Sequence, residues 1–239
     1  MINSLALLTI LIMLGISCKT NQSQQSETKW IFGKDDRLSY QEFIPSLMEQ
    51  AKSVGIMKSD NFFGTKASFL GPMVVKLPNR LTDSVKNKNA EHLCPDVRFR
   101  EEYVNGSCSV FLIHPQIIAT SGHCVKELLE LNRKGIEPKE SQLSFIIFDY
   151  YKSGKASYLE FPSENVFKVQ KLLSGLNESD SSANKEYDFV FLSLDRPTKC
   201  KPFVISWENT MNEQSEMYVL GHPAGIPMKA SKSTIKEIE

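Results

Sequence analysis

The chain has 239 residues, of which 41% are hydrophobic, so it is long enough for one folded domain with a sizeable core and a leader segment. Its 28 basic and 28 acidic side chains balance, and the composition therefore gives no indication of a nucleic-acid partner or of binding to an anionic surface. The sequence contains no internal repeats.

The N-terminus carries an apolar run over residues 5–16, interrupted only by Thr9 and Gly15. It is too short to span a bilayer and suits the hydrophobic region of a signal peptide. The run leads into Cys18 and a polar tract, a pattern that resembles a bacterial lipoprotein processing site with Cys18 as the acylated residue; plain secretion with cleavage nearby is the alternative. We therefore expect a signal peptide over 1–18, a flexible tether over 19–29 and a folded domain over 30–239, exported to the cell envelope or secreted.

Beyond the tether, short apolar stretches alternate with turn-forming residues, which favours an all-β architecture. Helical spacing of apolar residues over 40–57 indicates a helix or a strand-bearing lead-in. The remaining expected elements are mixed β structure over 65–77, a short helix over 125–132, strands over 143–151 and 156–167, a surface loop over 171–185, and a strand over 217–220.

Residues 108–124 predict a buried strand, a two-residue turn and a second apolar strand that stops at His123. An imidazole, with an ordinary pKa near 6.5, is the side chain best suited to accept and return a proton at neutral pH. A lone histidine after an apolar strand is usually a satisfied surface or core residue, and we interpret His92, His114 and His222 in that way. For His123, the apolar strand, the small lead-in residues and Cys124 come together and favour a general base.

A general-base histidine needs a carboxylate that fixes its tautomer and stabilises its protonated form. Asp188 is suitably placed, because it stands immediately before an apolar stretch of β-favouring residues, 189–194, that is closed by a charged turn and a proline. An aspartate in a turn before a strand is common, so Asp188 gains this role only in combination with His123 upstream.

At these positions the sequence resembles the trypsin-like serine peptidases. Residues 119–124, Ala-Thr-Ser-Gly-His-Cys, are similar to the histidine signature of that family, and residues 187–192 are similar to its aspartate segment. Three further segments resemble its bacterial, glutamyl-endopeptidase-like branch: 33–37, 94–99, and 219–229 with its Gly-His-Pro-Ala-Gly-Ile-Pro-Met-Lys sequence.

The resemblance implies a trypsin-like double β-barrel and peptide-bond hydrolysis, with His123 as base and Asp188 as its orienting partner. The family's nucleophile segment, Gly-x-Ser-Gly, is missing from the sequence; Ser231 and Ser233 lack the flanking glycines that would form an oxyanion hole. We therefore expect a domain truncated at its C-terminus, with an incomplete second barrel and little or no activity as given. An exported non-catalytic pseudo-protease with a binding or structural role is the alternative. No cofactor is expected, and the expected partner of a completed enzyme is a protein or peptide substrate.

Export also bears on the cysteines, because disulfides form in oxidising compartments. Apart from the lipidation candidate there are four, Cys94, Cys108, Cys124 and Cys200, which allow three connectivities. The resemblance favours a disulfide between Cys108 and Cys124, which leaves Cys94 and Cys200 as a possible second pair. A zinc site that includes His123 is disfavoured, because the spacing matches no Cys-x-x-Cys pattern and adjacent ligands fit one tetrahedral ion poorly, so we expect no metal.

Overall fold

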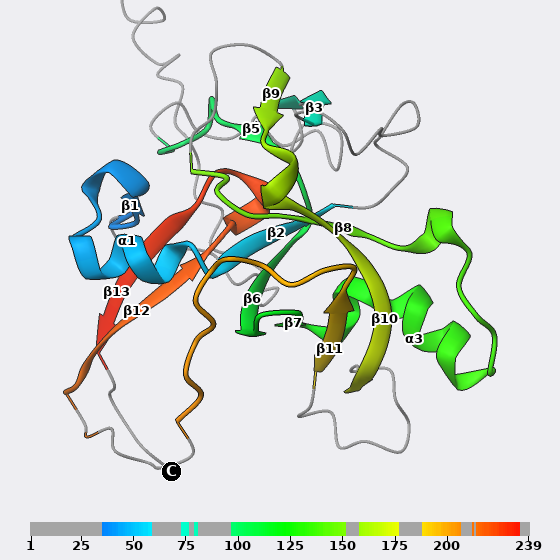
Figure 1. Ribbon diagram of the computed structural model, residues 1–239. Helices are drawn as coiled ribbons and strands as arrows, with labels where there is room; N and C mark the ends of the chain where they lie inside the picture. Colours follow the sequence, from blue (N-terminus) through cyan, green and yellow to red (C-terminus); the bar gives the residue numbers. More distant parts are fainter. Residues whose placement is uncertain are drawn as a thin grey trace, which may run out of the picture.

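The computed structural model describes residues 35–58, 73–76, 79–80, 97–151, 158–176, 188–206, 212 and 214–234. The described chain is mostly β, with one closed antiparallel barrel, a separate open sheet and few helices (Figure 1). The signal-peptide, tether and lipidation predictions, and Cys94, lie outside the described residues. Among those that are described, no helix has the length and apolar character needed to cross a membrane.

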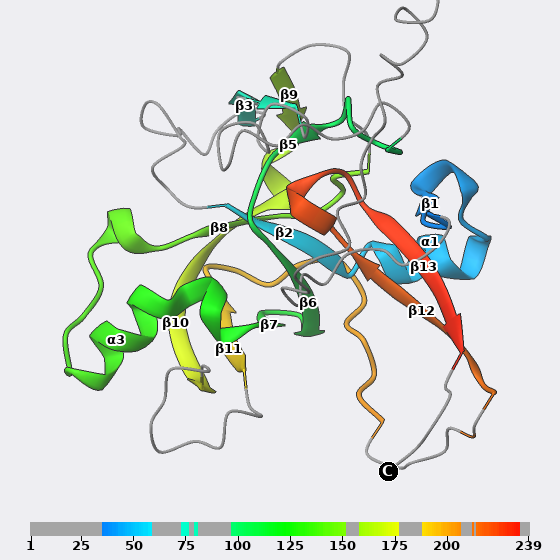
Figure 2. The ribbon, with the colours of Figure 1, turned by 180° about the vertical axis from the view of Figure 1, so that it is seen from behind.

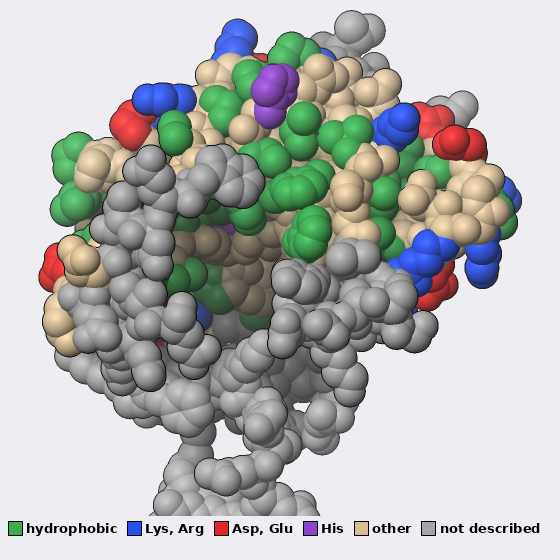
Figure 3. All heavy atoms as spheres, turned by 90° about the horizontal axis from the view of Figure 1, so that it is seen from below, with side chains coloured by type: hydrophobic (Ala, Val, Ile, Leu, Met, Phe, Trp, Pro, Cys, Tyr) green, Lys and Arg blue, Asp and Glu red, His purple; other side chains and the backbone are tan. Residues whose placement is uncertain are grey.

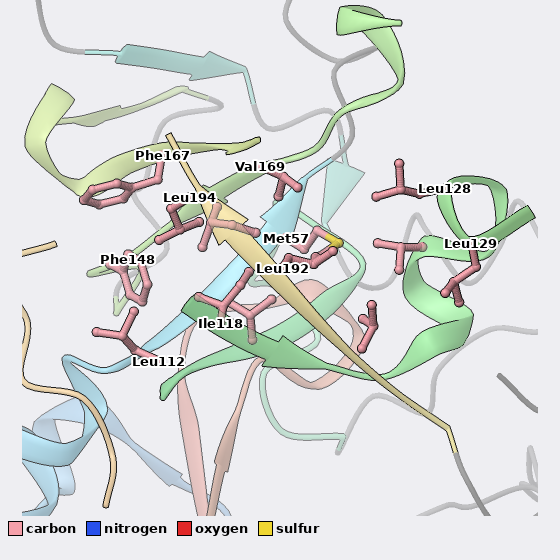
Figure 4. Close-up of a cluster of buried hydrophobic side chains, with 14 residues drawn as sticks. Met57, Leu112, Ile118, Leu128, Leu129, Phe148, Phe167, Val169, Leu192 and Leu194 are labelled. Atoms are coloured by element: carbon pink, nitrogen blue, oxygen red, sulfur yellow. The ribbon is translucent and has the colours of Figure 1, made fainter. Parts of the chain in front are cut away.

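Six strands close the barrel in the order β10-β11-β7-β6-β2-β8. Their bounds are β2 (Val54–Lys58), β6 (Cys108–His114), β7 (Ile117–Thr120), β8 (Phe145–Ile147), β10 (Val166–Leu176) and β11 (Phe189–Leu194). The core follows from alternation along these strands, because every second residue of β11 is buried. Helix α3 (Lys126–Arg133) adds Leu128 and Leu129 to the same cluster, and Figure 4 shows both pointing from the helix toward the strands.

The open sheet has the order β1-β13-β12, in which β1 is Leu38–Ser39, β12 is Glu216–Gly221 and β13 is Lys229–Thr234. It packs beside helix α1 (Pro45–Ala51), and both views of the ribbon place α1 next to β13 (Figures 1 and 2). A small core of Phe43, Leu47, Ala51, Val54, Met228 and Ala230 joins the sheet, the helix and strand β2 of the barrel. This second core is smaller than that of the barrel.

The barrel and the open sheet meet at two glycines. Gly225 lies in the short 3-10 turn η6 (Pro223–Gly225), with a φ of 79°, and its carbonyl accepts a hydrogen bond of 2.9 Å from the Asn105 N–H. A side chain on Gly225 would collide with the carbonyl oxygen of Gly106. A side chain on Gly106 would collide with the carbonyl oxygen of Met57. Backbone therefore approaches backbone here, which only glycine permits.

The remaining described elements are short: β3 (Met73–Lys76) pairs with β9 (Tyr158–Phe161), and β4 (Asn79–Arg80) pairs with β5 (Tyr103–Val104). Further 3-10 turns are η1 (Tyr40–Glu42), η3 (Gly122–Val125), η4 (Glu140–Gln142) and η5 (Ser163–Asn165).

The helix expected over 125–132 and the strands expected over 143–151 and 217–220 are present with shifted bounds. The strand region expected over 156–167 is divided by η5 into β9 and the start of β10, and of the β structure expected over 65–77 only β3 lies within the described residues. The loop expected over 171–185 is wrong in its first part, because β10 continues to Leu176. Residues 171–176 include three leucines, and they pair with the apolar strand β11 through two irregularities in register.

Candidate active site

His123 sits in the 3-10 turn η3, directly after strand β7. Strand β7 is held in the barrel by β6 and β11, and the Cys124 N–H donates to the Ser121 carbonyl at 3.1 Å, which tightens the turn after the strand. The imidazole projects from the barrel, and 61% of its side chain is exposed. A rigid strand end therefore presents a solvent-accessible imidazole.

Asp188 precedes strand β11, as the sequence predicts, and the register of β11 on β7 brings it to His123. Val190 lies opposite Thr120, so the start of β11 lies beside the end of β7. One carboxylate oxygen of Asp188 accepts the His123 backbone N–H at 2.9 Å, and the other lies 2.6 Å from His123 Nδ1. The Asp188 side chain is only 19% exposed. Two contacts therefore fix both the backbone and the ring of His123.

This geometry determines what His123 can do chemically. An ionised Asp188 can only accept hydrogen bonds, so Nδ1 carries the proton and Nε2 keeps its lone pair. Among the described residues, Nε2 has no hydrogen-bond partner and faces solvent. The pair can accept a proton at Nε2 and stabilise the resulting imidazolium, which is the function of a general base.

The disulfide between Cys108 and Cys124 is present. It links the start of β6 to the residue after His123, over a Cα–Cα distance of 6.2 Å. The turn that carries the imidazole is thus cross-linked to the barrel as well as hydrogen-bonded to Asp188.

The ligand atoms of Cys108, His123 and Cys124 also lie within 4.8 Å of one another, close enough to consider a metal. Both sulfurs are consumed by the disulfide, and neither is a thiolate that could bind a soft cation. In the oxidised protein these three residues therefore support the histidine turn and do not form a zinc site.

Ser109 makes a contact that sequence reasoning missed. Its hydroxyl oxygen accepts the backbone N–H of His222 at 2.7 Å, and its carbonyl accepts the Thr120 hydroxyl at 2.7 Å. It thereby connects the start of β6, next to the disulfide, with the turn of the open sheet and the end of β7. A separation of 113 residues between Ser109 and His222 leaves no local signal for this contact.

His222 is a core residue, in agreement with its interpretation from the sequence. Its ring is stacked on Tyr150, with centroids 5.6 Å apart, and Nδ1 lies 3.1 Å from the Ile226 carbonyl oxygen. Burial lowers its pKa to about 4, so the ring is neutral at ordinary pH. Its Nε2 has no partner among the described residues.

The other predicted positions do not reach His123 through any described hydrogen bond. Ser231 lies on β13, where its hydroxyl donates to Asp36 at 3.3 Å, and Ser233 lies further along the same strand. Cys200 has no disulfide partner within the described part of the chain, and burial raises the pKa of its thiol. Because Cys94 lies outside that part, the second disulfide stays a prediction.

The face seen from below in Figure 3 has hydrophobic side chains gathered in its middle and charged side chains mostly toward its edges. Several large hydrophobic residues are exposed, including Phe111 on β6 and Val204 and Ile205 after β11. The Phe111 ring meets Phe203 edge-on, with centroids 6.4 Å apart. Apolar surface of this kind is common where further protein packs.

Searches with the sequence find no matching family model and no matching curated protein. Among solved structures, the fold is similar to a chain described as "Structure of GrC", with 17% sequence identity and a TM-score of 0.35. The similarity covers 59% of this chain and 57% of that one.

Proposed function

We propose that this chain carries the base and orienting carboxylate of a serine-type endopeptidase. One observation supports the proposal above all: Asp188 binds both the backbone N–H and Nδ1 of His123, which directs an exposed Nε2 lone pair outward. The Cys108–Cys124 disulfide beside this histidine agrees with the same function. In the proposed fold, the closed barrel is the first half of a trypsin-like double barrel, and the β1-β13-β12 sheet belongs to its incomplete second half.

The proposed reaction requires a hydroxyl nucleophile within hydrogen-bonding distance of His123 Nε2. The imidazole would take the hydroxyl proton as the oxygen attacks the peptide carbonyl, and would then return that proton to the leaving amine. Asp188 would hold the ring in place throughout and stabilise the imidazolium. No serine within the described ranges bonds to His123, so the described residues supply the proton acceptor and not the nucleophile.

The test compares the 239-residue chain with extended forms of the protein. Each extended form adds the translation of the adjacent downstream DNA, either in the same reading frame or in a shifted one. Each is assayed on casein and exposed to a fluorophosphonate probe, which labels activated serines. We expect labelling and cleavage only in an extended form, and loss of both in its His123→Ala variant. Asp188→Asn should reduce the rate about 10⁴-fold, because the wrong tautomer is then favoured.

Failure of every extended form to react with the probe would exclude the peptidase proposal. Labelling of the 239-residue chain itself, abolished by His123→Ala, would instead identify a nucleophile within residues 1–239. A chain that neither reacts nor gains activity would favour the non-catalytic binding or structural role.

We also propose export, with lipid attachment at Cys18. The Cys108–Cys124 disulfide supports an oxidising location, since such bonds are rare in the cytosol. Growth with a radiolabelled fatty acid should label the wild-type chain but not the Cys18→Ser variant. Labelling of neither, with the protein found in the medium, would favour plain secretion.

A further inference from the structure

Three segments that are far apart in the sequence meet around the ring of Phe99. Arg37 lies just before β1, Arg98 precedes the ring itself, and Lys229 opens β13. Their cationic groups lie 5.1, 4.7 and 4.4 Å from the centroid of the ring, within the distance at which a cation is attracted by an aromatic ring. These four residues belong to three stretches, 33–37, 94–99 and 219–229, that stand out in the sequence.

Each of the three cations has a carboxylate nearby, and for Arg98 it is that of Glu42, 3.8 Å from Nη2. Arg37 donates from Nε and Nη2 to the two oxygens of Asp35, at 2.8 and 2.7 Å. Lys229, only 3% exposed, lies 3.0 and 2.9 Å from the oxygens of Glu102. Burial lowers the pKa of Lys229 and raises that of Glu102, so each charge depends on its partner. We call Phe99, its three cations Arg37, Arg98 and Lys229, and the carboxylates of Asp35 and Glu102 the Phe99 cluster.

The Phe99 cluster joins the segment before β1 to the rest of the molecule by several links. The Arg98 guanidinium donates to the Asp35 carbonyl at 3.0 Å, and the Ser231 hydroxyl donates to the Asp36 carboxylate at 3.3 Å. Phe99 itself has a φ of 64°, a left-handed conformation that disfavours a bulky side chain. The surroundings therefore hold the ring in place against a local backbone cost.

Backbone pairing alone would hold this segment weakly. Strand β1 has two residues, and it pairs with β13 only through Leu38 opposite Ala230 and Ser39 opposite Lys229. Such a short pairing is marginal in water without further contacts. Lys229 takes part in both the pairing and the Phe99 cluster, so the two attachments support each other.

We propose that residues 35–39 and the Phe99 cluster form a clasp that holds the open sheet against the barrel, and that opening of this clasp releases β12 and β13 while the barrel stays folded. The clasp is a conformational device and does not depend on the proposed peptidase function. The clasp makes the attachment of the open sheet depend on residues 35–39 and on the charges around one ring, in addition to the shared core and the contacts of the η6 turn.

Amide hydrogen exchange of the full chain, followed by mass spectrometry, tests the clasp. In Phe99→Leu, which keeps an apolar side chain but removes the aromatic face, exchange over 216–234 should become about fivefold to tenfold faster. Exchange over 108–120, in the barrel, should stay unchanged. Phe99→Tyr keeps the ring and should match the wild type within about twofold.

Two further variants make the result decisive. Arg98→Gln removes one cation from a half-exposed position and should accelerate exchange over 216–234 even where Phe99→Leu fails to fold. Lys232→Gln removes an exposed charge from β13 outside the clasp and should change nothing beyond the ends of the strand. Equal acceleration in barrel and sheet, or equal behaviour of the Leu and Tyr variants, would overturn the proposal. Because exchange needs no nucleophile, this outcome is independent of the probe-labelling result.

Discussion

The closed barrel and the open sheet are stabilised in different ways. The barrel pairs every strand on both sides and encloses a continuous core that includes the fully buried Ile118, Leu192 and Leu194. The sheet has an unpaired edge at β12 within the described residues, where Val219 is 60% exposed and Tyr218 is 37% exposed. The barrel can therefore hold His123 and Asp188 by itself, whereas the sheet depends on contacts with its neighbours.

The largest expected effect contrasts a core residue of the barrel with an exposed residue of the sheet. Leu192→Ala should lower the free energy of unfolding by about 4 kcal/mol, because it removes buried methyl groups and leaves a cavity. Val219→Ala should cost less than about 0.5 kcal/mol, since its side chain is already largely in water. Urea unfolding followed by circular dichroism measures both. Equal losses would show that the two regions are not built differently.

Acid should weaken the junction between the two regions through His222. Its pKa falls from 6.5 in the unfolded chain to about 4 in the folded one, because the ring is buried. Above pH 6.5 neither state binds the proton, and the full stability is present. As the pH falls from 6.5 toward 4, only the unfolded chain takes up a proton. The free energy of unfolding therefore falls by about 3 kcal/mol. Urea unfolding at both pH values should show this step in the wild type and not in His222→Gln, whereas identical pH profiles would contradict it.

The disulfide should stabilise the barrel by a similar amount. Cys108 and Cys124 are 16 residues apart, and closing a loop of that length is worth about 3 kcal/mol. The double variant Cys108→Ala with Cys124→Ala should unfold at correspondingly lower urea concentration. Reduction of the wild type should reproduce the loss. If reduction instead left stability unchanged, the hydrogen bonds of Asp188 alone would suffice to hold the histidine turn.

The smallest expected effect concerns the contact between Ser109 and His222. Ser109→Ala leaves the buried His222 N–H without its acceptor and should cost about 1 kcal/mol. Ser109→Thr keeps the hydroxyl and serves as the matched control. In the Ala variant, the rate of hydrogen exchange should rise more over 216–234 than over 108–120. A uniform rise would show that Ser109 supports the barrel only.

The His123–Asp188 pair could be predicted from the sequence because each residue adjoins an apolar strand that fixes its place. Their meeting in space depends on one register, Val190 opposite Thr120, which the strand pattern makes plausible without determining it. The Ser109–His222 contact and the Phe99 cluster could not be predicted in this way. Both arise where segments with no shared periodicity pack together. The segments of the Phe99 cluster stand out one by one in the sequence, but nothing in their residues shows that they meet.

The loop predicted over 171–185 is wrong in its first part for a related reason. Lys171, Ser174 and Gly175 are polar or small, yet they lie in β10 because β11 offers a long apolar strand to pair with. Irregularities in register let β10 curve along the barrel while Lys171 and Ser174 stay exposed. Tertiary pairing thus extended the strand over residues that the polar composition of 171–185 as a whole assigns to a loop.

The two glycines at the junction have a consequence for natural variation. Gly225 needs both its left-handed backbone and the empty space over Gly106, and Gly106 needs the space over Met57. A replacement at either position cannot be rescued by trimming a neighbouring side chain, because the obstacle is main-chain oxygen. Homologues that keep this junction should therefore retain both glycines together, and a lineage that loses one should show a rearranged junction between barrel and sheet.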